Sequence, residues 1–437
     1  MGVGGQRMRV CVQGLWHLGS VTAACLASVG HEVVGLDSDS EVVDNLRRAI
    51  PPVTESGLDR LIQEGINAGR LSFSSDAKNA VRDAKVLWVT YDTPVDGNDR
   101  ADVQTVLDQI AEILPYLEQH TIVLVSSQLP VGSIRCLEEI AERQCPESQL
   151  HFACSPENLR LGKALNVFLH PDRIIVGVRH QSARDTLEAL FRPITQDVVW
   201  MGVESSEMTK HAINAFLGLS ITFINEIGSV CEKIGADARE VEAGLKSEDR
   251  IGHKAYLSAG TAFAGGTLAR DIAYLEGTAE AEDLKVPLIS AVRISNDHHQ
   301  KWAQRQLESM IGDLAGKRIC VWGLTYKPGT NTLRRSLSVE LCNWLRSIGA
   351  EVVVHDPSSC ELPGEWHGHV VRADSPLEYL DGAIALIIST PWPEYREIPV
   401  TDVEAAAGQL TILDANRFLD DLSNSPILSY ISVGVGV

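Results

Sequence analysis

The fold is decided near the amino end, where the chain reads Arg9-Val-Cys-Val-Gln-Gly-Leu-Trp-His-Leu-Gly19. The apolar run at its start predicts a buried strand, and the glycines that follow predict a tight turn into a helix. A second run, Glu32–Leu36, predicts another strand, and Asp37 closes it. This order of elements, with an acid after the second strand, is typical of a dinucleotide-binding unit. We therefore predict that Gly14, Gly19 and Asp37 contact a dinucleotide.

Two residues of this unit bear on the identity of the cofactor. Asp37 favours NAD over NADP, because a carboxylate repels a 2′-phosphate group. Trp16 stands where the middle glycine is expected, and the missing side chain of that glycine lets the pyrophosphate approach the backbone. Two interpretations therefore stay open. Either Trp16 contacts a bound NAD, or the unit is an ordinary strand-turn-helix that no longer holds NAD in the usual pose.

The apolar pattern divides the chain into three parts. Residues 1–200 alternate short apolar runs with helical stretches, which predicts a parallel sheet with crossover helices. Residues 201–312 contain long helical stretches, from about Ser205 to Gly235 and from Ala279 to Gly312. The doubly wound pattern starts again in residues 313–437. The predicted fold class is α/β, with two Rossmann-like domains joined by a helical middle domain. The predicted strands include Arg9–Val12, Glu32–Leu36, Val86–Val89, Thr121–Val125, Arg173–Val176, Arg318–Trp322 and Glu351–His355.

Composition narrows the class of partner. The 437 residues carry a formal net charge of −20 at pH 7, so we expect neither nucleic acid nor an anionic membrane as a general partner. Nine cysteines, odd in number and without a CxxC pair, predict reduced thiols in a cytoplasmic protein and no metal site. Apolar runs such as Ala383–Ile388 have the length of a strand, so we expect no membrane-spanning segment.

The helix that begins near Ser206 carries candidate catalytic residues. Lys210 and Asn214 lie four residues apart and therefore share one face of that helix. An apolar set is expected to press the same face into the interior, and it consists of Ile213, Leu217 and Ile221. The alternative is that Lys210 extends its ammonium group to the surface, as isolated lysines commonly do.

Further motifs follow in order along nearly the whole chain. They are Tyr91–Pro94, Pro130–Ser133, Ser155–Arg160, Pro171–Gly177, Arg250–Gly252, Gly260–Asp271, Gly323–Thr330, Arg334, Thr390–Arg396 and Asp414–Arg417. Together with the first unit, this series resembles the UDP-glucose/GDP-mannose dehydrogenase family. The resemblance implies NAD-dependent oxidation of a nucleotide-linked sugar alcohol, and a homodimer that forms through the middle helices.

The resemblance also implies roles for single residues. Asp271 and its water remove a proton from the sugar hydroxyl, while Lys210 and Asn214 stabilise the developing alkoxide. The residues implied on the cofactor side are Gly14, Trp16, Gly19, Asp37, Thr93, Gln128 and Arg334. Those implied on the substrate side are Glu157, Leu161, Arg250, Tyr256 and Lys327. Arg396 and Arg417 are expected to bind phosphate or uracil, although arginines taken singly more often form salt bridges.

The chain departs from the family pattern at three positions that serve the second half of the family reaction. The family has a cysteine where this chain has catalytic-position Thr267, a glutamate at Leu161 and a threonine at Gln128. A thiol can form a nucleophilic thiolate, whereas an alcohol needs a dedicated base. We therefore predict that oxidation stops at the aldehyde. Two alternatives remain: a catalytically silent nucleotide-sugar-binding or regulatory homologue, and a dehydrogenase of another phosphorylated alcohol.

Overall fold

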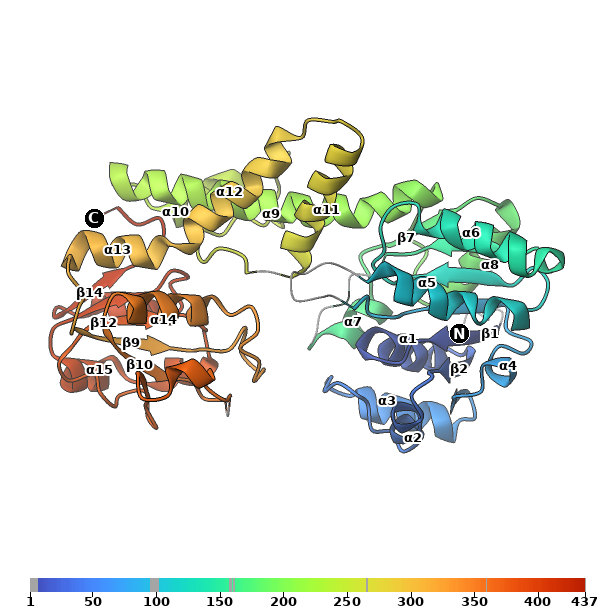
Figure 1. Ribbon diagram of the computed structural model, residues 1–437, viewed down its shortest axis with the longest axis horizontal. Coiled ribbons are helices and arrows are strands. Elements are labelled where there is room, and N and C mark those ends of the chain that lie inside the picture. Colours follow the sequence, from blue (N-terminus) through green and yellow to red (C-terminus); the bar gives the residue numbers. More distant parts are fainter. Residues whose placement is uncertain are drawn as a thin grey trace. The chain divides into compact units, whose positions relative to one another are not determined.

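The computed structural model describes residues 7–94, 102–156, 159, 162–264, 266–358 and 360–436. These residues form two compact units, Met1–Ala212 and Ile213–Val437 (Figure 1). The boundary falls inside one continuous helix, α9.

The first unit is built on an eight-stranded sheet with the order β3-β2-β1-β4-β5-β6-β7-β8. All neighbouring strands are parallel except β6 and β7, which are antiparallel. The strands are β1 Arg9–Gln13, β2 Glu32–Leu36, β3 Leu71–Ser74, β4 Val86–Val89, β5 Ile122–Val125, β6 His151–Cys154, β7 Ile174–Val178 and β8 Val198–Met201. The predicted parallel sheet is confirmed.

Helices cover both faces of this sheet, so its central strands are buried on both sides. They are α1 His17–Ser28, α2 Ser40–Arg47, α3 Leu58–Asn67, α4 Ala77–Ala80, α5 Val103–Ala111, α6 Ser133–Gln144, α7 Ala164–Leu169 and α8 Gln181–Phe191, with single-turn helices η1 Leu114–Tyr116 and η2 Pro146–Ser148. Successive residues of β1 enter opposite cores, since side chains alternate along a strand. Val10 and Val12 belong to one hydrophobic cluster and Cys11 to the other.

The second unit begins with helices and continues into a sheet. The helices are α9 Val203–Ile234, α10 Ala238–Lys246, α11 Thr267–Ala281, α12 Pro287–Gln300 and α13 Trp302–Ile311. The prediction of helix from Ala279 to Gly312 was partly wrong. The helical region starts earlier, at Thr267, and a break precedes Pro287, whose ring fixes the backbone angle suited to a first helical turn.

The sheet of the second unit has the order β11-β10-β9-β12-β13-β14, and all its strands are parallel. Its elements are β9 Arg318–Trp322, α14 Leu337–Ser347, β10 Glu351–His355, η3 Gly364–Trp366, β11 Val370–Arg372, β12 Ala383–Ile388, η4 Pro393–Glu397, α15 Val400–Ala407, β13 Leu410–Leu413, η5 Asp420–Asn424 and β14 Leu428–Ile431. Numbered from β9, this is the strand order 3-2-1-4-5-6 of dinucleotide-binding folds. The predicted α/β class with two Rossmann-like sheets and a helical middle is confirmed.

Helix α9 does not bury the face that the sequence predicted. The three apolar residues of that face, Ile213, Leu217 and Ile221, are only half-buried. The buried stripe recurs at steps of three and four residues and is mostly polar: Glu207, His211, Asn214, Gly218, Thr222 and Asn225. Apolar side chains of the same helix, Phe216, Phe223, Val230 and Ile234, are exposed. Hydrogen bonds formed by the buried stripe, described below, explain why polar residues occupy it.

Helix α9 is also the one helix of the described ranges that is long and apolar enough to cross a membrane, judged by length and composition. Long interior helices meet the same criterion, so it is weak evidence for a membrane protein.

Candidate active site

The end of β1 has the geometry expected of a dinucleotide-binding turn. Gly14 has a φ of +90°, and a β-carbon there would lie 2.7 Å from the ring of Tyr91. A β-carbon on Gly19 would lie 1.8 Å from the carbonyl oxygen of Gly14, so helix α1 packs directly against the turn. Trp16 is the residue that precedes α1, its side chain is 51% exposed, and it gives the helix no side-chain cap. The first amides of α1 therefore have no side-chain acceptor.

Asp37 is half-buried and holds this turn together. Its carboxylate accepts hydrogen bonds from the backbone N–H of Leu15 at 2.7 Å and of Asp39 at 3.0 Å. Each carboxylate oxygen has further lone pairs, so these two bonds leave acceptor capacity for ribose hydroxyls.

A second turn at the same edge of the sheet contains Gln128. The hydroxyl of Thr93 donates to the carbonyl oxygen of Gln128 at 2.7 Å, and the ring of His211 lies 3.2 Å from the carbonyl oxygen of Leu129. One helical turn before His211, the Glu207 carboxylate accepts the N–H groups of Gly132 and Ile134. Burial raises the pKa of Glu207, and the two N–H donors oppose that shift. The first turns of α9 thus fix the turn that carries Gln128.

A buried carboxylate links helix α1 to the segment that precedes α7. Glu55 accepts N–H groups from Gly162 at 2.8 Å and Ala164 at 3.0 Å, and it lies 3.2 Å from the ring of His17. His17 is the first residue of α1, next to Trp16. Glu157 and Leu161, which precede this anchor, lie outside the described residues.

In the second unit, helices α9 and α11 bring two predicted catalytic residues into contact. The amide of Asn214 donates to the carboxylate of Asp271, and their exposed fractions are 5% and 1%. Thr267 is the first residue of α11 and lies one turn before Asp271 on the same face, with its side chain exposed. Lys210, on the first unit's part of α9, precedes Asn214 by one turn and is half-buried.

The irregular segment before Thr267 is held by polar side chains that the sequence did not single out. Asn225 accepts the N–H of Gly260 at 2.9 Å, and the ring of His299 lies 2.8 Å from the carbonyl oxygen of Gly260. Asn296 binds both the N–H and the carbonyl of Phe263, at 3.0 and 2.9 Å. The spacing of the polar stripe on α9 could have identified Asn225, because a buried asparagine needs partners.

Arg335 is another residue that sequence reasoning missed. Its guanidinium lies 3.2 Å from the position that a β-carbon on Gly266 would occupy, immediately before Thr267. Gly266 has a φ of +104° and gives α11 no side-chain cap. Its neighbour Arg334, the predicted cofactor residue, is exposed.

The start of the second sheet repeats the first with one difference. Asp356, like Asp37, follows the second strand, and its carboxylate accepts the N–H groups of Leu324, Thr325 and Ser358. It also accepts the indole N–H of Trp392 at 3.2 Å. Burial alone would raise the pKa of Asp356, but these hydrogen bonds hold it below its usual value. With this many donors, Asp356 has far less room for a ribose than Asp37 has.

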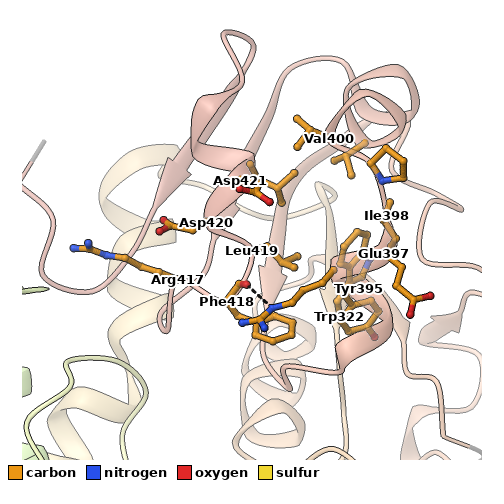
Figure 2. A pocket seen from close by; sticks show the side chains of 14 residues that line it. Trp322, Tyr395, Glu397, Ile398, Val400, Arg417, Phe418, Leu419, Asp420 and Asp421 are labelled. Atoms are coloured by element: carbon orange, nitrogen blue, oxygen red, sulfur yellow. Dashed lines mark hydrogen bonds between the residues drawn. The ribbon is translucent and has the colours of Figure 1, made fainter.

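The two arginines expected at phosphate or uracil have partners within the protein. Arg417, with a side chain only 9% exposed, donates to both oxygens of Asp237, at 2.6 and 2.9 Å. Arg396 lies over the ring of Phe418 at 4.1 Å and donates to its carbonyl oxygen (Figure 2). Both arginines line a cavity of about 500 Å³ between η4, α15 and η5. The salt-bridge alternative therefore describes Arg417 in this structure.

The remaining substrate-side candidates lie at the surface or close to it. Arg250 is 87% exposed and pairs with Glu248 at 2.9 Å, and Tyr256 is exposed. Lys327 is half-buried in the turn after β9, where its carbonyl accepts the hydroxyl of Thr330 at 2.8 Å.

Comparison with known proteins gives these features a family. Three domain models of the UDP-glucose/GDP-mannose dehydrogenase family match the chain: the NAD binding domain at residues 8–195, the central domain at 204–298 and the UDP binding domain at 320–421. The chain belongs to the UDP-glucose/GDP-mannose dehydrogenase family. The resemblance inferred from the motifs is confirmed.

Individual relatives match over almost their whole length. The chain is 34% identical to a UDP-glucose 6-dehydrogenase of Rhizobium meliloti, covering 98% of this chain and 99% of the relative. It is 31% identical to a UDP-glucose 6-dehydrogenase of Pseudomonas aeruginosa, covering 98% and 97%. The structure of a UDP-glucose dehydrogenase from Pyrobaculum islandicum superposes with a TM-score of 0.86, at 28% identity and full coverage of both chains.

Family membership establishes the reaction class. The protein is an NAD-dependent dehydrogenase that acts on a CH–OH group and binds a nucleotide sugar. The first unit fits NAD on its own geometry, since α1 begins without a side-chain cap beside the closely packed Gly14 and Gly19. Asp37 stands where a ribose acceptor is required.

Buried His299 makes the stability of the second unit depend on pH. Burial lowers the pKa of His299 below its usual 6.5, although its bond to Gly260 opposes this. The unfolded chain therefore binds the proton more readily, and the associated stability is present above the unfolded pKa and lost as pH falls through the folded pKa. We expect the thermal midpoint to fall less in His299→Gln than in the wild type between about pH 7 and about pH 5.

Differential scanning fluorimetry across that range measures the effect, with the exposed His253→Gln as the matched control. Parallel pH profiles for His299→Gln and the wild type would contradict the assignment.

Proposed function

We propose that the enzyme oxidises the primary alcohol of a nucleotide-linked sugar, UDP-glucose or a close analogue, and releases the aldehyde. The observation that carries the proposal is Thr267 at the start of α11, one turn before the buried Asp271. The group needed to remove a proton is retained, and a threonine stands at the position of the predicted nucleophile. The names of the Rhizobium meliloti and Pseudomonas aeruginosa relatives support UDP-glucose as the substrate.

The proposed roles follow the order of events at the sugar carbon. Asp271, through a water, accepts the proton of the hydroxyl, while its pairing with Asn214 keeps the carboxylate oriented. Lys210 and Asn214 stabilise the negative charge that develops on the oxygen. NAD, when bound, accepts the hydride from the same carbon. One two-electron oxidation thus gives an aldehyde, NADH and a proton.

We propose the binding residues and domains as the sequence suggested them. Residues 1–200 bind NAD through Gly14, Trp16, Gly19, Asp37, Thr93 and Gln128, with Arg334 reaching the cofactor from the carboxyl-terminal domain. Residues 313–437 bind the nucleotide, and residues 201–312 join the two. The proposed substrate contacts are Glu157, Leu161, Arg250, Tyr256 and Lys327.

The cysteines of the second unit support a reaction without a thiol nucleophile. Its four cysteines, Cys231, Cys320, Cys342 and Cys360, are all buried. Burial raises the pKa of Cys320 and of Cys342 to about 12, so the reactive thiolate is scarce at neutral pH. An aldehyde formed near Thr267 has no ready thiolate to capture it in this set.

The stoichiometry of NADH formation tests the proposal. With a panel of nucleotide sugars, we expect one NADH per sugar consumed and an aldehyde or its hydrate as the product, because nothing traps the aldehyde covalently. Absorbance and mass spectrometry measure both quantities. Two NADH per sugar and a uronic acid would refute the aldehyde endpoint, and no NADH with any nucleotide sugar would refute the substrate class.

Lys210 tests the assignment of the catalytic group. Lys210→Ala should lower turnover at least about a hundredfold, the usual scale for loss of a group that stabilises an oxyanion or transfers a proton. Steady-state kinetics with a folding check by circular dichroism gives the result. Lys233→Ala, an exposed lysine in the last turn of α9, is the control and should keep full activity. Undiminished turnover in a folded Lys210→Ala enzyme would sink the assignment.

We also propose a cytoplasmic homodimer that buries the exposed apolar side of α9. Phe216, Phe223 and Val230 repeat every seven residues, and Ile234 extends the row, as in a helix that packs on another helix. Phe223→Lys should shift the protein from dimer to monomer, because it places a charge in the proposed contact. Sedimentation velocity measures the change. A monomeric wild type, or a variant that stays dimeric, would contradict this contact.

A further inference from the structure

Asn416 connects the second Rossmann-like sheet to the segment that precedes Thr267. Its side-chain oxygen accepts the backbone N–H of Thr261 at 2.9 Å and lies 3.3 Å from the Thr261 hydroxyl. The same oxygen lies 2.3 Å from the position that a β-carbon on Gly260 would occupy. The absence of a side chain at Gly260 therefore makes room for the carboxamide of Asn416, whereas its backbone requires no left-handed conformation.

Two other elements hold the same short segment. Asn225 of α9 binds the N–H of Gly260, and His299 of α12 binds its carbonyl. Irregular backbone held by side chains from three separate elements is positioned more firmly than a surface loop. Of the three, Asn416 alone belongs to the nucleotide-binding part of the family.

The position of Asn416 in its own domain places it near the expected nucleotide. It follows β13, at the carboxyl edge of the sheet, where open α/β sheets bind ligands. The adjacent Arg417 fixes the same loop to α10 through its two bonds to Asp237. A change at this edge of the sheet therefore reaches Thr261 through one short loop.

We propose that Asn416 is a positioning residue, through which nucleotide binding in the carboxyl-terminal domain holds Gly260–Thr261, and hence Thr267 and Asp271, in the reactive arrangement. This inference rests on the proposed function. It assigns Asn416 no contact with the reacting atoms, and its effect on catalysis is indirect.

Hydrogen–deuterium exchange tests the positioning without requiring turnover. In the free protein, Asn416→Ala should speed exchange in peptides covering residues 259–264, whereas Asn416→Asp, which keeps the acceptor, should not. Adding UDP should slow exchange of that segment in the wild type, and the effect should disappear in Asn416→Ala even though calorimetry shows bound UDP. Asn424→Ala, exposed at the end of η5, is the control. Unchanged exchange in Asn416→Ala, or UDP binding to the wild type without protection of this segment, would overturn the proposal.

Kinetics and a double-mutant cycle separate positioning from general stability. Asn416→Ala should lower kcat at least about tenfold with little change in KM for the sugar, and Asn416→Asp should recover most of the loss. Gly260→Ala should be as harmful in the wild type, but much less so in the Asn416→Ala background, where the added methyl has space. Additive effects of the two substitutions would overturn the contact.

A wild type that forms no NADH with any nucleotide sugar would refute the proposed function instead. The exchange comparison between Asn416→Ala and Asn416→Asp would still decide whether Asn416 holds the segment.

Discussion

The buried polar stripe of α9 is the constraint on which both halves of the site depend. In the first unit, Glu207 and His211 fix the turn after β5. In the second, Asn214 pairs with Asp271 and Asn225 holds Gly260. A buried polar group without its partner costs about 1–3 kcal/mol, so each residue of the stripe strongly disfavours any other arrangement of its own neighbours. A leucine-rich stripe would pack well but would tolerate sliding, whereas hydrogen bonds specify position.

The two Rossmann-like sheets show how one topology supports two ligands. Each ends its second strand in an aspartate that accepts the amide following the first strand's glycine, Asp37 from Leu15 and Asp356 from Leu324. Asp37 takes two backbone donors and keeps capacity for a ribose. Asp356 also takes the indole of Trp392, so its oxygens are largely satisfied by the protein itself. The acid that serves recognition in the NAD domain is thus structural in the other, and a nucleotide there must be recognised by different groups.

Much of the fold could be predicted because its signals are local. Glu32–Leu36 is a strand with the predicted bounds, and the glycines around Trp16 mark a turn whose geometry only small residues permit. The buried face of α9 could not be predicted from apolarity, since its partners are distant: Glu207 binds Gly132, and Asn225 binds Gly260. Asn214 and Asp271 were predicted from a motif, but Asn416 has no local pattern, because its role exists only where a loop 155 residues away meets it.

The replacement at position 267 acts on one half of a two-step oxidation. The first step needs a base and a hydride acceptor, and the buried Asp271 with Asn214 supplies the protein's share of it. A second oxidation first needs an oxygen or sulfur nucleophile added to the aldehyde, because only a tetrahedral adduct carries a hydride to lose. Thr267 is exposed and has an alcohol far less acidic than a thiol, so it would need a base of its own. Asp271 lies on the same face but is already bonded to Asn214. The arrangement therefore favours release of the aldehyde over its capture.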